Sequence, residues 1–153
     1  MTTPEQRLEA LDLPVPEVAA PVATYVPAVR SGQHVFTSGQ LPMQYGELLL
    51  TGKVGGQVGL EEAQRCAQQC ALNAIAAVKS VVGELSAVTR VVKVVVFVAS
   101  TPDFTGQPQV ANGASELLGA AFGDAGVHAR SAVGVSVLPL DAPVEVELVV
   151  EVA

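Results

Sequence analysis

The sequence VHARSAVGV at residues 127–135 and the sequence VEVELVVEV at residues 144–152 are both rich in β-branched residues. Such runs are typical of β-strands, and the intervening LPLDAP at residues 138–143 separates them. Side chains alternate between the two faces of a strand, so residues 130, 132, 134 and 136 would share one face. The opposite face, formed by residues 129, 131, 133 and 135, is mostly apolar and could face the core.

Arg130 is the only permanently positive side chain in residues 94–153, and it lies within the first apolar run. A tight hairpin around Leu140 and Asp141 would place it opposite Glu151 as a cross-strand ion pair. Alternatively, the small residues 132 and 134 beside it leave space for a ligand. The planar guanidinium can hold both oxygens of a carboxylate at once. The spacing of the residues leaves both interpretations open.

The composition favours one globular domain with an apolar core, because the chain has 153 residues of which 50% are hydrophobic. Only 15% are charged, and the surplus of apolar residues suggests a subunit interface. The net charge of −7, with scattered basic residues, argues against nucleic acid as a partner. Because no signal peptide or membrane-spanning run is recognisable, we expect no membrane association and a cytoplasmic location.

Cys66 and Cys70 are spaced to lie on the same face of a helix. This is not the spacing of a redox pair or of a complete metal site, and His34 and His128 are far away in the sequence. We therefore interpret both cysteines as small buried apolar residues and expect no metal.

The order of the expected elements predicts a layered structure of helices on a sheet. Residues 1–21 would form a capped helix beginning at Thr3, followed by a proline-rich arm, and residues 22–153 would form the main domain. Strands are expected at 25–29, 34–38, 88–99 and in the two final runs, and helices at 60–82 and 108–122. Two helices would cover one face of a mixed sheet. The other face would be buried by oligomerisation or by the sheet's own curl.

Several motifs together resemble the RidA family, also called the YjgF family. They are ARSAV at 129–133, LP at 138–139, VEVE at 144–147, TSGQLP at 37–42, YV at 25–26, and DF at 103–104 followed by Asn112. The resemblance covers about residues 22–153 in the same element order. It implies a chorismate-mutase-like α+β subunit that forms a homotrimer around a central barrel, with three active sites in the clefts between subunits.

The resemblance also implies an activity and the residues that perform it. Family members hydrolyse reactive 2-imino acids and their enamine tautomers, such as 2-iminopropanoate and 2-aminoacrylate, to 2-oxo acids and ammonia without a cofactor. Arg130 would hold the substrate carboxylate, and Glu145 would activate the attacking water. The remaining pocket residues carried over by position are Tyr25, Ser38, Gly39, Asn112 and Ala132.

Three features depart from the family pattern and indicate a divergent branch. Ala132 replaces a cysteine that is common in the family, so thiol chemistry is excluded, although a backbone contact could be kept. His128 replaces a frequent proline, and it could either enter the pocket or cap a turn. The N-terminal arm is longer than usual.

Two other classes of function compete with the deaminase. A non-catalytic trimer that binds small carboxylates, or acts like a chaperone, would need Arg130 but not Glu145. Endoribonuclease activity or translation inhibition, functions sometimes attached to the family, is disfavoured by the acidic charge, because a nuclease must approach a polyanion.

Overall fold

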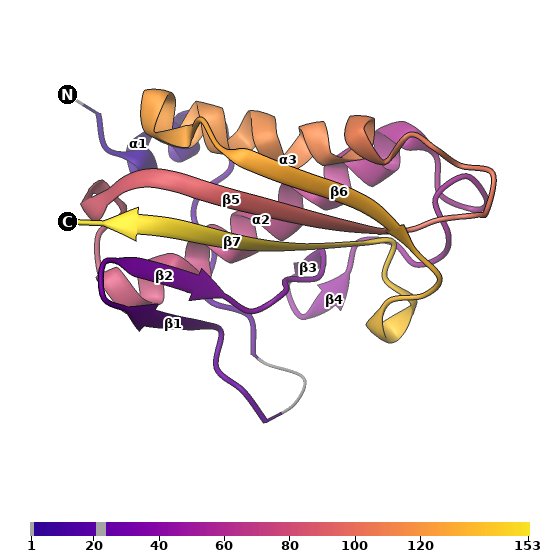
Figure 1. Ribbon diagram of the computed structural model, residues 1–153, viewed down its shortest axis with the longest axis horizontal. Helices are drawn as coiled ribbons and strands as arrows, with labels where there is room; N and C mark the ends of the chain where they lie inside the picture. The colour runs from indigo at the N-terminus through magenta and orange to yellow at the C-terminus, as the bar shows by residue number, and fades with distance from the viewer. Residues whose placement is uncertain (1, 21–23) are drawn as a thin grey trace.

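The computed structural model describes residues 2–20 and 24–153, which form a mixed five-stranded sheet with two long helices behind it (Figure 1). The helices are α1 (Pro4–Ala10), α2 (Leu60–Val82) and α3 (Gln107–Phe122), with 3-10 turns η1 (Leu85–Ala87), η2 (Gly123–Gly126) and η3 (Pro139–Asp141). The strands are β1 (Ala28–Ser31), β2 (His34–Thr37), β3 (Met43–Gln44), β4 (Glu47–Leu48), β5 (Val88–Ala99), β6 (Ala129–Val135) and β7 (Val144–Val152). The large sheet has the strand order β1-β2-β7-β5-β6, and the predicted α+β arrangement is confirmed.

The central strand β5 determines which residues face the helices. It pairs with β6 in parallel and with β7 antiparallel, so that Val94 lies beside both Arg130 and Leu148. Residues paired across a sheet point to the same face. Because Val94 and Leu148 are buried under the helices, Arg130 also points to the helix side.

Two expectations for the strand at 129–135 are therefore wrong. Its residues 129, 131, 133 and 135 lie on the face away from the helices, and Val133 is 45% exposed. The strand also does not pair with β7, because β5 lies between them; Glu151 is instead opposite Arg90 and His34. The cross-strand ion pair of Arg130 with Glu151 is therefore excluded. The segment between the two strands contains η3 and does not form a hairpin turn.

The long helix α2 packs closely on the sheet because its buried face carries small residues. Alanines 63, 67, 71, 74 and 77 of that helix are fully buried, as are Cys66 and Cys70. Both cysteines are free, which confirms that they act as small core residues. Burial raises the pKa of Cys66 to about 11 and raises the pKa of Cys70 well above its usual value.

The helices α2 and α3 approach each other at a glycine. A Cβ atom on Gly113 would collide with the backbone carbonyl of Gln64 in α2. The Gln64 side chain reaches back across the same contact, where its Nε2 donates to the Gln109 carbonyl at 2.9 Å. Gly113 weakens helix propensity, and the close crossing explains why a glycine stands there.

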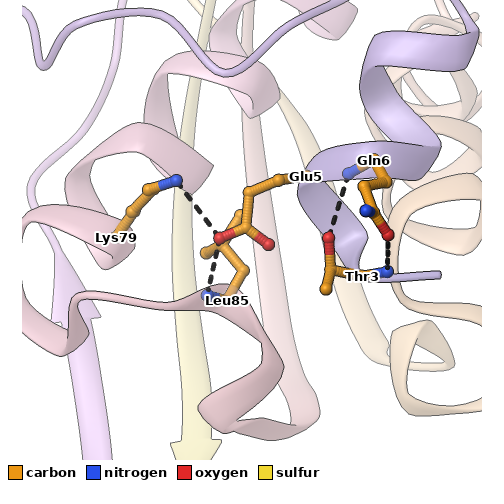
Figure 2. Close-up of polar contacts among 5 residues, drawn as sticks. All are labelled: Thr3, Glu5, Gln6, Lys79 and Leu85. Atoms are coloured by element: carbon orange, nitrogen blue, oxygen red, sulfur yellow. Dashed lines mark hydrogen bonds and ion pairs between the residues drawn. The ribbon is translucent and has the colours of Figure 1, made fainter. Parts of the chain in front are cut away.

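The N-terminal helix is fixed to the body of the molecule by polar contacts (Figure 2). The Thr3 hydroxyl accepts from the Gln6 backbone N–H at 3.1 Å, and Gln6 Oε1 accepts from the Thr3 N–H at 2.9 Å, which is the predicted capping box. Glu5 accepts from Lys79 Nζ at 3.2 Å and from the Leu85 backbone N–H at 3.1 Å. α1 is thereby joined to the end of α2 and to η1.

The face of the sheet away from α2 and α3 carries an apolar area among charged side chains such as Glu147 and Lys93, and no α-helix within the described residues covers it. At one end of this face, Phe97 and Val135 pack against a small buried cluster of Leu41, Ala99, Leu138 and Ala142. Phe36, 48% exposed, lies on this face with Val133, and the half-buried Val95, Phe97 and Val149 complete the apolar area. The sequence analysis named two ways to bury this face, oligomerisation or the sheet's own curl. The sheet does not curl over it within the described residues, so burial by oligomerisation stays as the prediction. No helix in residues 2–20 or 24–153 combines the length and apolarity that crossing a bilayer requires.

We expect Gly113→Ala to lower the free energy of unfolding by about 1–3 kcal/mol, because two backbones would have to move apart. Gly119→Ala is the matched control on the same helix, where a Cβ atom meets nothing within 4 Å. That change should stabilise the protein by about 0.5–1 kcal/mol through helix propensity. Denaturant unfolding of both variants measures the difference, and equal effects would contradict the close-contact explanation.

Glu5 should make the stability of the protein depend on pH. Burial alone would raise the pKa of Glu5, but the Leu85 N–H, its own backbone N–H and Lys79 outweigh burial and lower it. Ionised Glu5 therefore stabilises the fold at pH values above its unfolded-state pKa. This stabilisation is lost as the pH falls through its folded-state pKa. Glu5→Gln should therefore destabilise by about 0.5–1 kcal/mol at pH 7, and the deficit should shrink below about pH 4.

Glu9→Gln provides the control for this measurement, because Glu9 is exposed on the same helix. Unfolding curves of the two variants at pH 7 and pH 3 make the comparison. A Glu5→Gln deficit that is the same at both pH values would show that the carboxylate charge is not the cause.

Candidate functional site

Glu145 lies on β7, on the face of the sheet away from the helices, and the end of β2 positions its carboxylate. Gln40 forms an antiparallel bridge to Val146, with backbone hydrogen bonds of 2.8 and 3.0 Å. The Glu145 side chain lies against Gly39, next to this bridge. A Cβ atom on Gly39 would overlap the Glu145 carboxylate, so the absence of a side chain at position 39 makes the space that the carboxylate occupies.

Ser38 and Tyr25 complete this group of residues. The Ser38 hydroxyl donates to the Val26 carbonyl at 2.6 Å, and its backbone N–H donates to the Pro27 carbonyl at 2.8 Å. These bonds hold the segment after Tyr25 against the end of β2. Tyr25, Ser38, Gly39 and Glu145 all line one groove of about 1240 Å³. The structure thus brings together four residues that the sequence motifs had grouped only by resemblance.

The floor of the groove is held by a buried polar network that sequence reasoning missed. Gln69 Nε2 donates to Asn73 Oδ1 at 3.1 Å, and Asn73 Nδ2 donates to the carbonyls of Leu41 and Met43 at 3.0 and 2.9 Å. The irregular backbone after Gly39 is therefore satisfied by side chains of α2. The sequence signal that could have revealed this network is the presence of two amide side chains, Gln69 and Asn73, on the buried face of a helix. The opposite wall is the N-terminal arm, residues 12–20.

Burial and a neighbouring carboxylate shape the electrostatics of Glu145. Burial raises the pKa of Glu145 above its usual value, and the negative charge of Glu147 raises it further. A carboxylate whose pKa is raised binds a proton more readily than an exposed one. Glu145 is accordingly a better general base than an ordinary surface glutamate, provided that it remains ionised.

Arg130 lies elsewhere, on the edge strand β6 under the first half of α3. Its Nη1 donates to Asn112 Oδ1 at 2.9 Å and to the Ser115 hydroxyl at 3.2 Å, and its Nη2 donates to the Pro108 carbonyl at 3.3 Å. The guanidinium is thus oriented by three acceptors, all from one helix. The half-buried Ala132 follows on the same strand face.

The contacts of Arg130 leave two of its donors available to a ligand. A guanidinium has five N–H groups, and those contacts use both N–H groups of Nη1 and one of Nη2. Among the residues that the structure describes, Nε–H and the second Nη2–H of Arg130 have no hydrogen-bond partner. Two donors in a fixed plane match the two oxygens of a carboxylate.

The groups around Arg130 and Glu145 do not meet within one chain. Arg130 points to the helix side, whereas Glu145 pairs with Phe97 on the other face. Their strands lie on opposite sides of β5, which corresponds to about 10 Å in the plane of the sheet. We call the group around Glu145 the carboxylate half-site and the group of Arg130, Asn112 and Ser115 the arginine half-site.

His128 caps a turn, which is one of the two interpretations that the sequence left open, and it also contacts Ser115. Its Nδ1 lies 2.6 Å from the Gly126 carbonyl, which caps the turn after α3, and its Nε2 lies 2.8 Å from the Ser115 hydroxyl. His128 therefore reaches the arginine half-site through Ser115. The sequence analysis did not identify Ser115, which has no motif around it.

The chemistry available to the two half-sites is complementary. The arginine half-site can bind a carboxylate, and the carboxylate half-site can bind a cation or accept a proton from water. Within the described residues, no three histidine, cysteine or acidic side chains are grouped so that they could hold a metal ion.

Three comparisons with known proteins agree on one family. Residues 5–152 match the family described as "YjgF/chorismate_mutase-like, putative endoribonuclease". The chain is 45% identical over 145 residues to Protein TCP17 of Trypanosoma cruzi, covering 94% of this chain and 91% of that protein.

Two solved structures are also similar. The protein Atu1372 of Agrobacterium tumefaciens, of unknown function, superimposes with a TM-score of 0.93 at 44% identity, covering 98% of this chain and 92% of that one. Escherichia coli TdcF, crystallised with bound serine, superimposes with a TM-score of 0.68 at 25% identity, covering 90% of this chain and 94% of that one.

Glu145→Gln should increase stability at neutral pH. Because the folded pKa of Glu145 is raised, its ionised form disfavours the fold above that pKa, and the penalty disappears below the unfolded-state value. The free energy of unfolding of Glu145→Gln should exceed that of the natural protein by up to about 1 kcal/mol at pH 8, and the two should be equal at pH 3. Thermal unfolding at the two pH values measures this. Glu116→Gln, which removes one exposed charge from α3, controls for net charge, and an equal gain there would contradict the local cause.

Proposed function

Because the chain belongs to the YjgF family, also called the RidA family, we propose that it hydrolyses reactive 2-imino acids and their enamine tautomers to 2-oxo acids and ammonia, without a cofactor. The observation that carries this proposal is the orientation of Arg130. Its guanidinium is held by three acceptors, while two of its donors remain available for a carboxylate. A 2-imino acid has a carboxylate next to the reacting carbon, so the position of its C=N bond is fixed when the carboxylate is bound.

The serine bound to the related TdcF supports a ligand of this class, because serine also carries a carboxylate next to a nitrogen-bearing carbon. Asn112 would stand beside the bound carboxylate, since its side chain already contacts Arg130. Ala132, the next residue on the same strand face, leaves room there and could offer its backbone.

Glu145 would deliver the water. In the proposed step it accepts a proton from a water molecule while the oxygen adds to the carbon of the protonated imine. The proton then passes to the nitrogen, and the C–N bond breaks as ammonia leaves. The hydroxyl group gives up its remaining proton through Glu145, and the carbonyl of the 2-oxo acid forms while ammonia takes up that proton as ammonium. A protonated imine is already electrophilic, so orientation and one general base are enough. Tyr25, Ser38 and Gly39 would line the pocket around the reacting carbon.

The complete site would lie between two subunits of a homotrimer. Arg130 and Glu145 face opposite sides of the sheet, so one chain cannot apply both to one small molecule. The apolar face carrying Phe36 and Val133 needs a cover, and three such faces turned inward would form a central barrel. The arginine half-site of one subunit would then face the carboxylate half-site of the next.

The test measures 2-oxo acid formation when the protein is added to an amino acid oxidase that generates imines of alanine, leucine and glutamate. We expect acceleration by the natural protein and its loss in Arg130→Ala and Glu145→Gln. Arg130→Lys should be nearly as damaging as Arg130→Ala, because a point charge cannot replace two coplanar donors. Full activity of Arg130→Lys would overturn the role of Arg130 as a clamp.

The same assay tests the location of the site when two inactive variants are refolded together. If each site uses Arg130 from one subunit and Glu145 from another, an equal mixture of Arg130→Ala and Glu145→Gln chains should recover roughly a quarter of the natural activity, since each intact half is present with probability one half. Refolding either variant alone is the control. No recovery from mixed trimers would place both residues of each site in one chain.

Other outcomes would favour the competing functions. A trimer that binds 2-oxo acids through Arg130 but accelerates no hydrolysis would be a carboxylate-binding module. RNA affinity that falls steeply with salt would support the nuclease, which the net charge of −7 disfavours.

A further inference from the structure

We infer that His128 and Ser115 are positioning residues that hold Arg130 in the orientation needed to bind a carboxylate. The inference rests on the proposed role of Arg130 as the clamp and adds the residues that set its geometry. Neither residue belongs to the motifs by which the chain resembles its family, and His128 replaces a proline that is frequent there.

With a neutral imidazole, the hydrogen bonds from Gly126 to Arg130 can have only one direction. A carbonyl oxygen can only accept, so the Gly126 carbonyl 2.6 Å from His128 Nδ1 requires the hydrogen to be on Nδ1. In the neutral ring, Nε2 must then be the acceptor, and the Ser115 hydroxyl 2.8 Å away donates to it. The lone pairs of Ser115 remain free to accept from Arg130 Nη1 at 3.2 Å.

Ser115 needs His128 because of its place in a helix. A serine inside a helix readily turns its hydroxyl to donate to a carbonyl three or four residues earlier, which here belongs to Asn112 or Ala111. That rotation would move the Ser115 oxygen and weaken its contact with Arg130. His128 offers a competing acceptor 2.8 Å from the Ser115 oxygen and so keeps the hydroxyl beside the guanidinium.

The position of His128 is itself fixed by close packing. A Cβ atom on Gly126 would collide with the Leu118 carbonyl of α3, so only glycine allows the turn to lie this close to the helix. The Gly126 carbonyl is therefore held at a fixed place, and it determines both the position and the tautomer of the imidazole.

The test compares binding of a 2-oxo acid, 2-oxobutanoate, to purified variants by calorimetry, together with imine hydrolysis. His128→Leu removes the acceptor and should raise both Kd and KM about five- to tenfold with little change in kcat, because the clamp holds ground state and transition state alike. His128→Gln retains an acceptor and should stay within about twofold of the natural protein.

A double-substitution cycle separates positioning from a purely structural role. Ser115→Ala removes the relay and favours the helix, so it remains useful even if His128→Leu folds poorly. Ser115→Ala should raise Kd by a similar factor, and adding His128→Leu to it should have no further effect. Independent, additive losses would overturn the relay.

Nitrogen-15 NMR of His128 provides a readout that does not depend on any ligand. For the neutral ring, the structure requires the tautomer protonated at Nδ1, and the tautomer protonated at Nε2 would overturn the inference. If Arg130→Ala leaves 2-oxobutanoate binding unchanged, the proposed role of Arg130 in binding the substrate carboxylate is wrong, and the proposed function is contradicted. If Arg130→Ala abolishes binding while Ser115→Ala and His128→Leu do not affect it, only the present inference fails.

Discussion

The alternation of side chains along β5 is the constraint on which the rest of the structure depends. This strand pairs with β6 on one side and β7 on the other, so its register sets the direction of every side chain in both. Val94, Val96 and Val98 are buried under the helices, and burial of this valine series fixes the register, because a shift by one residue would expose it. Arg130 must consequently face the helices, and Glu145 must face away from them.

This constraint explains why the two half-sites are built so differently. The arginine half-site is assembled from neighbouring turns of α3 and the strand that follows it, so its contacts are local in the sequence. The carboxylate half-site joins β7 to segments more than a hundred residues earlier, through the bridge of Gln40 with Val146 and the space left by Gly39. Asn73 then supports the same loop from the helix side.

Much of the fold could be predicted because its signals are periodic and local. The helix at 60–82, the strand at 88–99 and the capping box at Thr3 are confirmed, since each follows from its own residues. The partner of β6 could not be predicted, because parallel and antiparallel pairing produce the same alternation in one strand. The hairpin of β3 and β4 was also missed. Gly46 is the only turn signal there, because the other turn residue, Tyr45, is of a type that rarely adopts its positive φ of 53°. The resemblance grouped the site residues, but the division into half-sites and the role of Ser115 required coordinates.

Because both cysteines are buried, the surface of the chain should be inert toward thiol-directed electrophiles. With its pKa near 11, only about one Cys66 side chain in ten thousand is a thiolate at pH 7, and the thiolate is the nucleophilic form. Cys70 is fully buried, and alanine occupies position 132. The folded protein should therefore resist alkylating reagents, and a single cysteine introduced on its surface would accept a thiol-directed probe with almost no background labelling.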